Sequence, residues 1–526
     1  MKALLLGSMS AALILAASVA VAAPAAPDGT ARMRAADVPS AATESVSEGS
    51  VTVGGQRIDY RAVAGTLVVR PREWKADEPD SPEASMFYAA YFKKGAPAAE
   101  RPVIFIYGGG PGVSTLWLHM GSFGPKRVWL NDAAHTPAPY RLIDNTYSLL
   151  DVADVVFIDA PGTGFSEIRG RGKEKAFYGV DEDAHAFARF ITGFLSKYGR
   201  WRSPKYISGE SYGTPRSAVL ANMLAGEYHV DLNGVIMLSQ ILNYDLGAGA
   251  SEFNPGTDQP YIVALPAYAA AAWYHNRLGP KRPEKLEPFL REVEQFATTD
   301  YAVALQAGSL LELARREAIA KRMSEYLGLS ADYILKSDLR LDARQFRKML
   351  LDSQNQSIGD IDARYIGPHS DPLAKGAGYD TVFAAIGSAY VAGFNDYVRG
   401  TLGYGEGLTY AVGIDVILDW QWQRAQPSNA PTRVFGIVNV MPDLATAMKT
   451  NPDLKVQVHG GYFDLSTSYF QGWYEMHHLQ IPLSLQDNIE YHYYPSGHMI
   501  FLHEPSLRDL HTNIADFIRR TSSVRH

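Results

Sequence analysis

A serine inside the run Gly-Glu-Ser-Tyr-Gly, residues 209–213, constrains the fold of this chain more than any other feature. The run follows residues 205–208, which are predicted as a strand, and precedes residues 216–224, which are compatible with a helix. Small residues on both sides of the serine permit a tight, strained strand-to-helix turn that holds its Oγ above the sheet. The pattern predicts Ser211 as a nucleophile and directs the backbone N–H of Tyr212 at a developing oxyanion.

Short apolar strands surround this motif and alternate with helical patterns. Between two of these strands, apolar residues at helical spacing predict a helix over residues 181–198. Apolar strands separated by helices are typical of a mainly parallel sheet covered on both faces. The sequence therefore predicts an α/β protein with the α/β-hydrolase fold, a mainly parallel central sheet flanked by helices. The predicted strands are residues 51–53, 57–61, 65–70, 86–92, 102–107, 154–159, 205–208, 234–238, 455–459 and 488–494.

Helical patterns replace the strand rhythm between residues 246 and 430. Residues 310–320 and 345–351 are the clearest of them. A helical block inside a sheet domain predicts a helical cap insertion over the site. It divides the α/β core into a first part, residues 46–245, and a second part, residues 431–526.

The first 23 residues have the plan of a secretory signal peptide, with a basic start, an apolar centre and the small-residue pattern Ala20-Val21-Ala22. An uncleaved membrane anchor is the alternative for the same run. Residues 24–45, rich in Ala, Pro, Ser and Thr, predict a disordered leader. The chain contains no cysteine, so disulfides are excluded. Export without disulfides favours a periplasmic or extracellular protein of a Gram-negative bacterium, with no membrane contact after signal cleavage.

A serine hydroxyl needs a base, and in this fold the triad runs along the chain in the order serine, acid, histidine. His498 lies in a loop just after the last predicted strand, where the base is expected. The competing histidines fall within helical or strand patterns or lead into the last helix: His477, His478, His492 and His503.

The acid that orients the base should follow an earlier strand. Asp464 closes the run Gly-Gly-Tyr-Phe-Asp, directly after the predicted strand 455–459. Its role is to select the imidazole tautomer and to stabilise the imidazolium. Asp443 and Asp487 remain alternatives.

A run of glycines at residues 108–112 follows the predicted strand 102–107. Glycine allows a bare N–H to approach an oxyanion without a Cβ in the way, so this loop is the candidate for the second oxyanion donor. A phosphate-binding loop is excluded because no Gly-Lys-Ser/Thr follows.

Charge and composition exclude other classes of function. The formal net charge is −7 and the sequence pI is about 6.1, without the basic stripe that nucleic-acid binding requires. No cluster of His, Asp or Glu has metal-ligand spacing, and no metal or organic cofactor is implied. The sequence leaves the oligomeric state open, a homodimer included.

Several motifs occur together in a fixed order: residues 109–114 (Gly-Gly-Pro-Gly-Val-Ser), 159–166 (Asp-Ala-Pro-Gly-Thr-Gly-Phe-Ser), 209–213, 461–464 (Gly-Tyr-Phe-Asp) and 496–499 (Ser-Gly-His-Met). Together they resemble the serine carboxypeptidase family, peptidase S10, from about residue 85 to the last residue of the chain. Residues 260–268 also resemble the bacterial branch of that family.

The resemblance implies a role for each matching residue: Ser211, Asp464 and His498 as the triad, the N–H groups of Gly110 and Tyr212 as the oxyanion hole, and Gly109 and Glu210 as substrate contacts. In the family, a glutamate at the position of Glu210 helps to hold the free C-terminal carboxylate of a peptide. A carboxylate accepts another only when a proton lies between them. Acidic pH should therefore favour peptide turnover.

Three positions depart from the family pattern. Gly108 stands where the family usually has asparagine, and Ser122 stands where it has an acid, and both family residues serve the substrate carboxylate. Val113 replaces the family cysteine. The triad is complete while recognition of the carboxylate is depleted, and Arg127 or Lys126 is the candidate for a replacement cation.

The leading interpretation is a secreted serine carboxypeptidase that releases C-terminal amino acids from peptides through an acyl-enzyme. The alternative is a serine esterase, another exopeptidase or an acyltransferase on the same fold. A non-catalytic binding protein on this scaffold is the remote third reading, since both triad and oxyanion elements are complete.

Overall fold

The computed structural model describes residues 44–78, 80–247, 255–424 and 438–522. The predicted signal peptide and residues 24–43 of the predicted leader lie outside these ranges. Glu44 and Ser45, which the sequence assigned to the leader, instead begin the first strand and pair with Gly65 and Ala64. The reason is a long-range contact that composition does not reveal, because the Glu44 carboxylate accepts a hydrogen bond from the Tyr88 hydroxyl.

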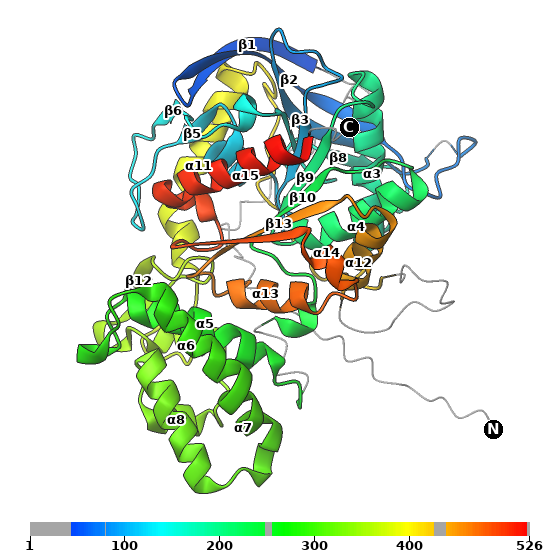
Figure 1. The fold of residues 1–526 in the computed structure, drawn as a ribbon. Helices are drawn as coiled ribbons and strands as arrows, with labels where there is room; N and C mark the ends of the chain where they lie inside the picture. Colours follow the sequence, from blue (N-terminus) through cyan, green and yellow to red (C-terminus); the bar gives the residue numbers. More distant parts are fainter. Residues whose placement is uncertain (1–43, 79, 248–254, 425–437, 523–526) are drawn as a thin grey trace, which may run out of the picture.

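A central sheet of ten strands organises the described residues (Figure 1). Its strand order is β1-β2-β3-β7-β4-β9-β10-β13-β14, with β8 paired to β3. The strands are β1 (Glu44–Val53), β2 (Gln56–Val69), β3 (Glu83–Lys93), β4 (Val103–Tyr107), β7 (Asp154–Ile158), β8 (Glu167–Arg169), β9 (Lys205–Glu210), β10 (Gly234–Leu238), β13 (Lys455–Gly461) and β14 (Ile489–Tyr494). Two small hairpins pair β5 (Lys126–Val128) with β6 (Leu142–Asp144) and β11 (Gln356–Ile358) with β12 (Ile366–Pro368).

The six strands β7, β4, β9, β10, β13 and β14 are parallel to one another, and β1, β2 and β3 add an antiparallel edge that joins them at β7. The chain leaves β4 for β7 on one side and then reaches β9 on the other side. Where strand order reverses in this way, the loops at the carboxyl ends of the strands separate and leave a crevice for a ligand. The predicted fold class, an α/β-hydrolase sheet flanked by helices, is confirmed.

The antiparallel edge is more continuous than the sequence indicated. Residues 57–61 and 65–70 were expected as separate strands, but the single strand β2 joins them, pairing with β1 over residues 56–65 and with β3 over residues 60–69. Gly54 and Gly55 form the predicted turn before it, with φ of 56° and 79°. Pairing on both sides extends the strand through the small residues at 62–66, where propensity alone is weak.

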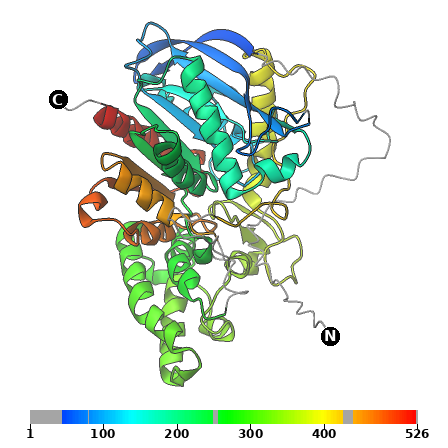
Figure 2. The ribbon, with the colours of Figure 1, turned by 90° about the vertical axis from the view of Figure 1, so that its right-hand side faces the viewer.

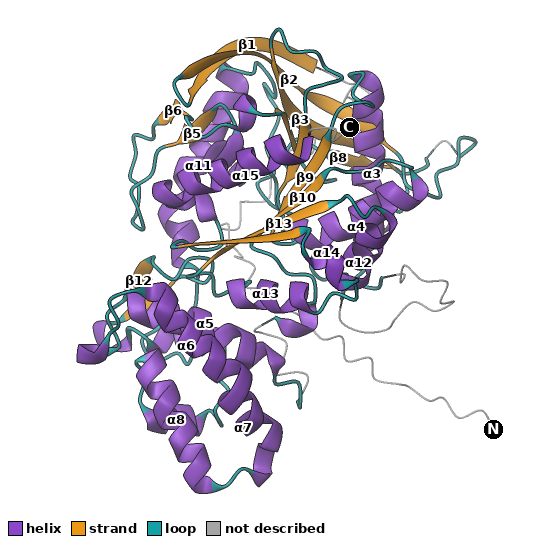
Figure 3. Cartoon of the chain, viewed as in Figure 1, coloured by secondary structure: helices purple, strands orange, loops and turns teal. Residues whose placement is uncertain are grey.

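Helices cover both faces of the sheet, as Figures 1 and 3 show. One face packs on α3 (Val180–Lys197), α4 (Gly213–Glu227) and α12 (Met441–Thr450), and the other on α11 (Thr381–Gly400) and α15 (Glu504–Ser522). Each contributes an apolar stripe to one of two buried clusters. Smaller helices are α1 (Leu116–Leu118), α2 (Lys173–Phe177), α13 (Tyr469–His477) and α14 (Leu483–Gln486).

A helical lobe with its own apolar core lies below the sheet in Figure 1 and projects from it in Figure 2. It is built from α5 (Gln259–Tyr274), α6 (Leu286–Phe296), α7 (Ala302–Ala307), α8 (Leu313–Leu327), α9 (Ala331–Lys336) and α10 (Ala343–Met349). The helix predicted over 310–320 begins only at Leu313, because residues 308–310 form a 3-10 turn.

Helix α11 lies inside the predicted cap segment but does not join this lobe. Its buried face, including Ile386, Tyr390 and Phe394, packs into the apolar cluster on the sheet. The insertion therefore returns to the core before β13. Among the described residues, no helix combines the length and apolarity needed to cross a membrane, and no three His, Asp or Glu residues gather as metal ligands would.

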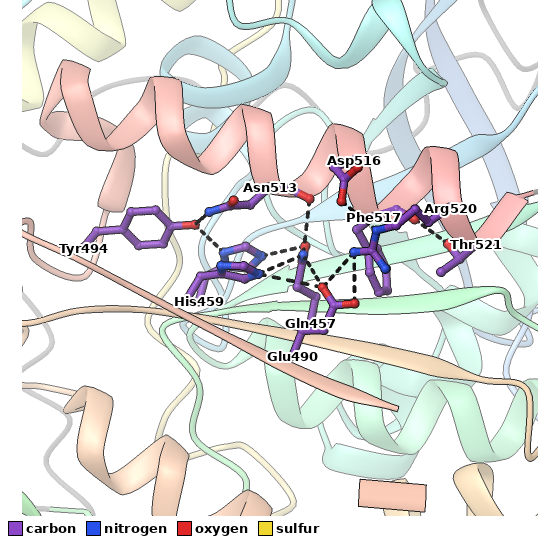
Figure 4. A network of polar contacts seen from close by, with 10 residues as sticks. Gln457, His459, Glu490, Tyr494, Asn513, Asp516, Phe517, Arg520 and Thr521 are labelled. Atoms are coloured by element: carbon purple, nitrogen blue, oxygen red, sulfur yellow. Dashed lines mark hydrogen bonds and ion pairs between the residues drawn. The ribbon is translucent and has the colours of Figure 1, made fainter. Parts of the chain in front are cut away.

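A buried polar network fastens the last helix to the last two strands (Figure 4). His459 Nε2 donates to Gln457 Oε1 at 2.9 Å, and His459 Nδ1 lies 2.8 Å from the Tyr494 hydroxyl. The Gln457 amide and the side chain of Asn513 then connect this pair to α15, since Gln457 Nε2 donates to Asn513 O and Asn513 Nδ2 donates to the Tyr494 hydroxyl. Strand β13, which leads to Asp464, is held from this side.

Candidate active site

The turn that carries Ser211 is strained in the way the sequence predicts. Ser211 has a φ of 58°, which is uncommon for a residue with a Cβ and typical of a strand-to-helix turn that presents a nucleophile. Its N–H donates to Leu238 O at the end of the adjacent β10, and its carbonyl accepts from the Thr214 N–H and hydroxyl. Ser211 itself is half-buried, so its side chain can meet a substrate.

The glycine loop after β4 lies directly against this turn. A Cβ on Gly109 would be 2.6 Å from the backbone N of Tyr212 and 2.9 Å from the Cβ of Ser211, so only glycine permits this approach. Gly110 has a φ of 108°, a conformation that also favours glycine. The loop that carries the predicted donor Gly110 and the turn that carries the predicted donor Tyr212 are thus packed backbone to backbone.

Asp464 and His498 form a buried pair at the ends of β13 and β14. His498 Nδ1 lies 2.8 Å from Asp464 Oδ2, and Asp464 is fully buried. The other oxygen, Oδ1, accepts from the backbone N–H groups of Ser466 at 2.9 Å and Thr467 at 3.0 Å. These bonds fix the carboxylate, and a fixed carboxylate holds the imidazole in the tautomer that leaves Nε2 free to act as a base.

Two hydroxyl groups support this pair, and sequence reasoning missed both. Thr467 Oγ1 lies 2.8 Å from Asp464 Oδ2 and 3.0 Å from His498 Nδ1, and it donates to Ser239 O at 3.0 Å. Ser239, with a φ of 53°, donates its own hydroxyl to His498 O. The position of Thr467, three residues after the acid, was the available signal for the first. The strained backbone of Ser239 cannot be read from the sequence.

A segment of the insertion also touches the loops that carry Asp464 and His498. His498 N donates to Ile361 O at 2.6 Å, Leu465 N donates to Asp360 O at 2.9 Å, and Ala363 N donates to Phe463 O at 2.9 Å. A Cβ on Gly497 would lie 2.4 Å from both Ile361 O and the Cβ of Asp362. Backbone from the middle of the insertion therefore holds the loop of the base.

Charges around His498 determine its ionisation. Burial lowers the pKa of His498, but the charge and hydrogen bond of Asp464, with the further charges of Glu210 and Asp360, outweigh burial and raise the pKa to about 9. Glu210 is close enough to His498 and Asp464 for both charges to act on it. The turn that carries Ser211 and the loop that carries His498 thus meet at one edge of the sheet, while a direct Ser211–His498 hydrogen bond stays a prediction.

Glu210 is the second perturbed carboxyl group at this edge. It is 5% exposed, and its Oε1 has no hydrogen-bond partner among the described residues. Burial raises the pKa of Glu210 to about 7, against a lowering by His498 and a further raising by Asp464. A buried, unpartnered carboxyl that titrates near neutrality is suited to bind a polar group of a substrate.

The residues that depart from the family pattern supply no acid or cation to Glu210. Ser122 is buried, and its hydroxyl donates to Leu118 O at 2.6 Å. Lys126 pairs with Asp144 and Arg127 with Glu504, and neither cation is among the charges that shift the pKa of Glu210. Arg127 reaches the same region as Glu210, since both charges act on the pKa of Tyr390, but neither candidate cation bonds to Glu210 Oε1.

The alternative triad residues lie elsewhere. Asp443 is buried in α12 and pairs with Arg424 and Asn222, and Asp487 is exposed after α14. The other histidines occupy α13 and its end, β14, and the residue before α15: His477, His478, His492 and His503.

Comparison with known proteins supports the resemblance over part of the chain. Residues 76–245 match the model of the peptidase S10 family, described as serine carboxypeptidase. Serine carboxypeptidase-like 13 of Arabidopsis thaliana is 30% identical over 167 residues, which are 30% of this chain and 36% of that protein. The pheromone-processing carboxypeptidase KEX1 of Saccharomyces cerevisiae is 28% identical over 169 residues, 31% of this chain and 22% of that protein. The matches therefore span about a third or less of these relatives.

Solved structures align with low scores. The proline iminopeptidase of Mycobacterium smegmatis has a TM-score of 0.33 and 13% identity, over 90% of this chain and 99% of that chain. The sequence relatives are eukaryotic, so they do not bear on the bacterial branch. The family match supports a hydrolase of the serine carboxypeptidase type.

Proposed function

We propose that this protein is a secreted serine carboxypeptidase that removes C-terminal amino acids from peptides. Ser211 Oγ attacks the carbonyl carbon of the last peptide bond while His498 Nε2 takes its proton. The N–H groups of Gly110 and Tyr212 receive the oxyanion. His498 then gives the proton to the departing amine, and water hydrolyses the acyl-enzyme by the same steps.

The observation that carries this proposal is the buried Asp464–His498 pair beside the strained turn of Ser211. A carboxylate fixed by backbone N–H groups and bonded to Nδ1 has the geometry of an orienting acid rather than of a surface ion pair. The glycine loop packs directly against Tyr212, so the N–H groups proposed as oxyanion donors belong to two adjoining backbone segments. The family match over residues 76–245 supports the carboxypeptidase class.

The surroundings of Glu210 support a free carboxylate as the group of the substrate that the protein recognises. Its unpartnered Oε1 and its pKa of about 7 let it hold a proton at mildly acidic pH and donate it to an anionic substrate group. No described residue bonds to Glu210 Oε1, so we assign this recognition chiefly to Glu210.

The proposal is tested by mass spectrometry of a defined peptide mixture before and after incubation with the protein. Stepwise loss of C-terminal residues, blocked by a fluorophosphonate and absent for C-terminal amides, is the expected result. Shortening of the peptides from the N-terminus, or cleavage of C-terminal amides at the same rate, would mean that the protein is another kind of serine peptidase. If the fluorophosphonate does not label the protein, it is not a serine hydrolase.

Glu210→Gln should change how peptide turnover depends on pH. In the native protein, the ratio of kcat/KM for a peptide with a free C-terminus to kcat/KM for p-nitrophenyl acetate should fall about tenfold per pH unit above pH 7, because ionised Glu210 repels only the substrate that carries a carboxylate. Ionisation of His498, whose pKa is raised to about 9, affects both substrates alike and cancels in the ratio. The glutamine amide donates at every pH, so this fall should disappear. The measurement is kcat/KM between pH 5 and 9 for the peptide and for p-nitrophenyl acetate. An unchanged profile in the variant contradicts proton sharing at Glu210.

The same substitution should stabilise the protein at alkaline pH. The folded state keeps a proton on Glu210 up to about pH 7, whereas an exposed glutamate loses it near 4.5, so stability is full at low pH and falls as pH rises through 7. Glu210→Gln should therefore raise the free energy of unfolding by roughly 1–3 kcal/mol at pH 8.5 and have little effect at pH 4.5. Denaturant unfolding at the two pH values gives the answer.

Glu475→Gln provides the contrast. Burial also raises the pKa of Glu475 to about 7, but its carboxylate accepts from the N–H groups of Leu242 and Asn243 and from the amides of Gln240 and Gln471. An amide cannot accept all four, so at pH 8.5, where Glu475 is ionised, this variant should be less stable than the Glu210→Gln protein. Equal behaviour of the two variants would contradict the difference in their hydrogen bonding.

A second candidate function rests on the departures at Gly108 and Ser122. If Glu210 alone holds a carboxylate too weakly, the same acyl-enzyme serves an ester, another peptide end or an acyl acceptor other than water. Rates on p-nitrophenyl esters, blocked peptides and free peptides separate these classes.

We also propose a periplasmic location, from the signal pattern and the absence of cysteine. The resemblance of residues 260–268 supports a place in the bacterial branch of the family.

A further inference from the structure

Arg216 is a fully buried arginine five residues after the nucleophile. It lies in the first turn of α4, is 1% exposed, and is the one charged residue in that helix before its last residue, Glu227. Taking a guanidinium out of water is costly, and a buried ion pair is often no more stabilising than apolar side chains of the same volume. The position of Arg216 therefore calls for a role beyond packing.

The Arg216 guanidinium joins three separate parts of the fold. Its Nε donates to Asp183 Oδ2 at 2.6 Å and its Nη2 to Asp183 Oδ1 at 3.2 Å, which makes a two-pronged bond to α3. Its Nη1 donates to Gly108 O at 2.6 Å, in the glycine loop after β4. Since Arg216 belongs to the helix that begins at the nucleophile turn, one side chain ties that helix to both neighbours.

Aromatic rings hold the guanidinium in this position. Its central carbon lies 4.4 Å from the ring centre of Phe187 and 5.3 Å from those of Tyr107 and Tyr212. Although burial lowers it, the Asp183 carboxylate raises the pKa of Arg216 above its ordinary value, so the group remains charged. The charge of Arg216 is thus compensated by Asp183, and the plane of its guanidinium is fixed. Of the three rings, that of Tyr212 belongs to a proposed oxyanion donor and that of Tyr107 precedes the glycine loop.

A hydrogen bond to the carbonyl of Gly108 affects the orientation of the proposed oxyanion donors. Gly108 O belongs to the peptide group that precedes Gly109, and Gly109 is the residue whose missing Cβ permits contact with the backbone N of Tyr212. Rotation of the 108–109 peptide would tilt the next one, which presents the N–H of Gly110. A donor to Gly108 O therefore controls the direction of one oxyanion donor relative to the other.

We infer that Arg216 is a positioning residue for the oxyanion hole: it sets the glycine loop against the nucleophile turn so that the N–H groups of Gly110 and Tyr212 converge. Arg216 is too deeply buried to touch substrate, so it acts through Gly108. This inference rests on the proposed function only in requiring Ser211 to form a tetrahedral intermediate. It holds equally for peptide and ester substrates.

The experiment compares Arg216→Lys and Arg216→Gln with the native protein on p-nitrophenyl acetate and an arylboronic acid. Active sites are counted by end-point titration with a fluorophosphonate, so that kcat refers to folded, reactive protein. We expect kcat to fall about 100-fold with little change in KM, since misplaced groups of this kind cost on that order and the oxyanion exists only in the transition state. Affinity for the boronic acid, whose adduct places an oxygen in the oxyanion hole, should fall in parallel.

Arg200 offers a matched control in the same fold. It is also 1% exposed, pairs with the buried Asp154 and donates to a backbone carbonyl, that of Arg101. This cluster lies where β4, β7 and β9 begin, at the end of the sheet opposite the site. Arg200→Lys and Arg200→Gln should lower thermal stability without changing kcat per titrated site or the boronic acid affinity.

Three outcomes decide the matter. If the Arg216 variants lose stability only, as the Arg200 variants should, Arg216 is structural and the inference is overturned while the proposed function stands. If the native protein neither reacts with the fluorophosphonate nor hydrolyses the ester, both fail. If neither Arg216 variant folds, Asp183→Asn decides: its amide still holds one prong of the guanidinium, so kcat should fall several-fold, and a native kcat in that folded variant overturns the inference.

Discussion

Ser211→Ala should reduce turnover of any substrate of this protein by on the order of 10⁵-fold or more, with KM nearly unchanged. Alanine fits the strained turn as well as serine does, since both carry one Cβ, and Ser211 makes its observed bonds through its backbone N–H and carbonyl. The fold should therefore persist while the nucleophile is lost. The measurements are the amount of product formed in assays stopped at fixed times and the labelling of the variant by a fluorophosphonate.

Double substitution sharpens this test. Ser211 and His498 are proposed to act as a unit, so the pair Ser211→Ala and His498→Ala should be no slower than Ser211→Ala alone. Additive losses would mean that His498 acts on a step without the serine. Residual labelling of the Ser211→Ala protein would place the nucleophile at another residue.

Asp464→Asn should lower kcat about 10⁴-fold while leaving the structure intact. Asparagine can keep one acceptor oxygen for the N–H groups of Ser466 and Thr467, but its amide then faces His498 Nδ1. That arrangement favours the tautomer with the proton on Nε2, and such an imidazole cannot take a proton from serine. The rate loss should be largest near neutral pH.

Asp443→Asn is the control for this variant. Asp443 is a fully buried aspartate, paired with Arg424 and Asn222, and it was one of the alternative acids. Its replacement should destabilise the fold and leave kcat per active site unchanged. If Asp443→Asn lowered kcat and Asp464→Asn did not, the assignment of the acid would be wrong.

The sheet could be predicted from the sequence because its strands are short, apolar and separated by helices. Strand β9, the turn at Ser211 and helix α4 carry a local signal in consecutive residues, and β13 and β14 place Asp464 and His498 directly after strands. Position after a strand is enough to bring side chains to one edge of a parallel sheet. Such residues can be found without knowing any tertiary contact.

Other parts of the site depend on contacts between distant residues. Ile361 contributes a backbone carbonyl, which every amino acid possesses, so nothing in its identity marks it. Ser239, with its positive φ, bonds to His459 in β13 and to the loops of Thr467 and His498, all far along the chain. Arg216 was open to detection as a charge within an otherwise apolar and small-residue helix, but its partner Asp183 lies in another helix.

The bond from the backbone N–H of His498 to the carbonyl of Ile361 has a consequence for how such a protein can change over evolution. The insertion and the loop that carries His498 share several main-chain hydrogen bonds. Replacing the insertion by a foreign one would break these bonds and displace the loop of the proposed base. Diversification in this lineage should therefore proceed by point changes on the exposed faces of the lobe, with the stretch at residues 360–363 inherited together with the histidine it holds.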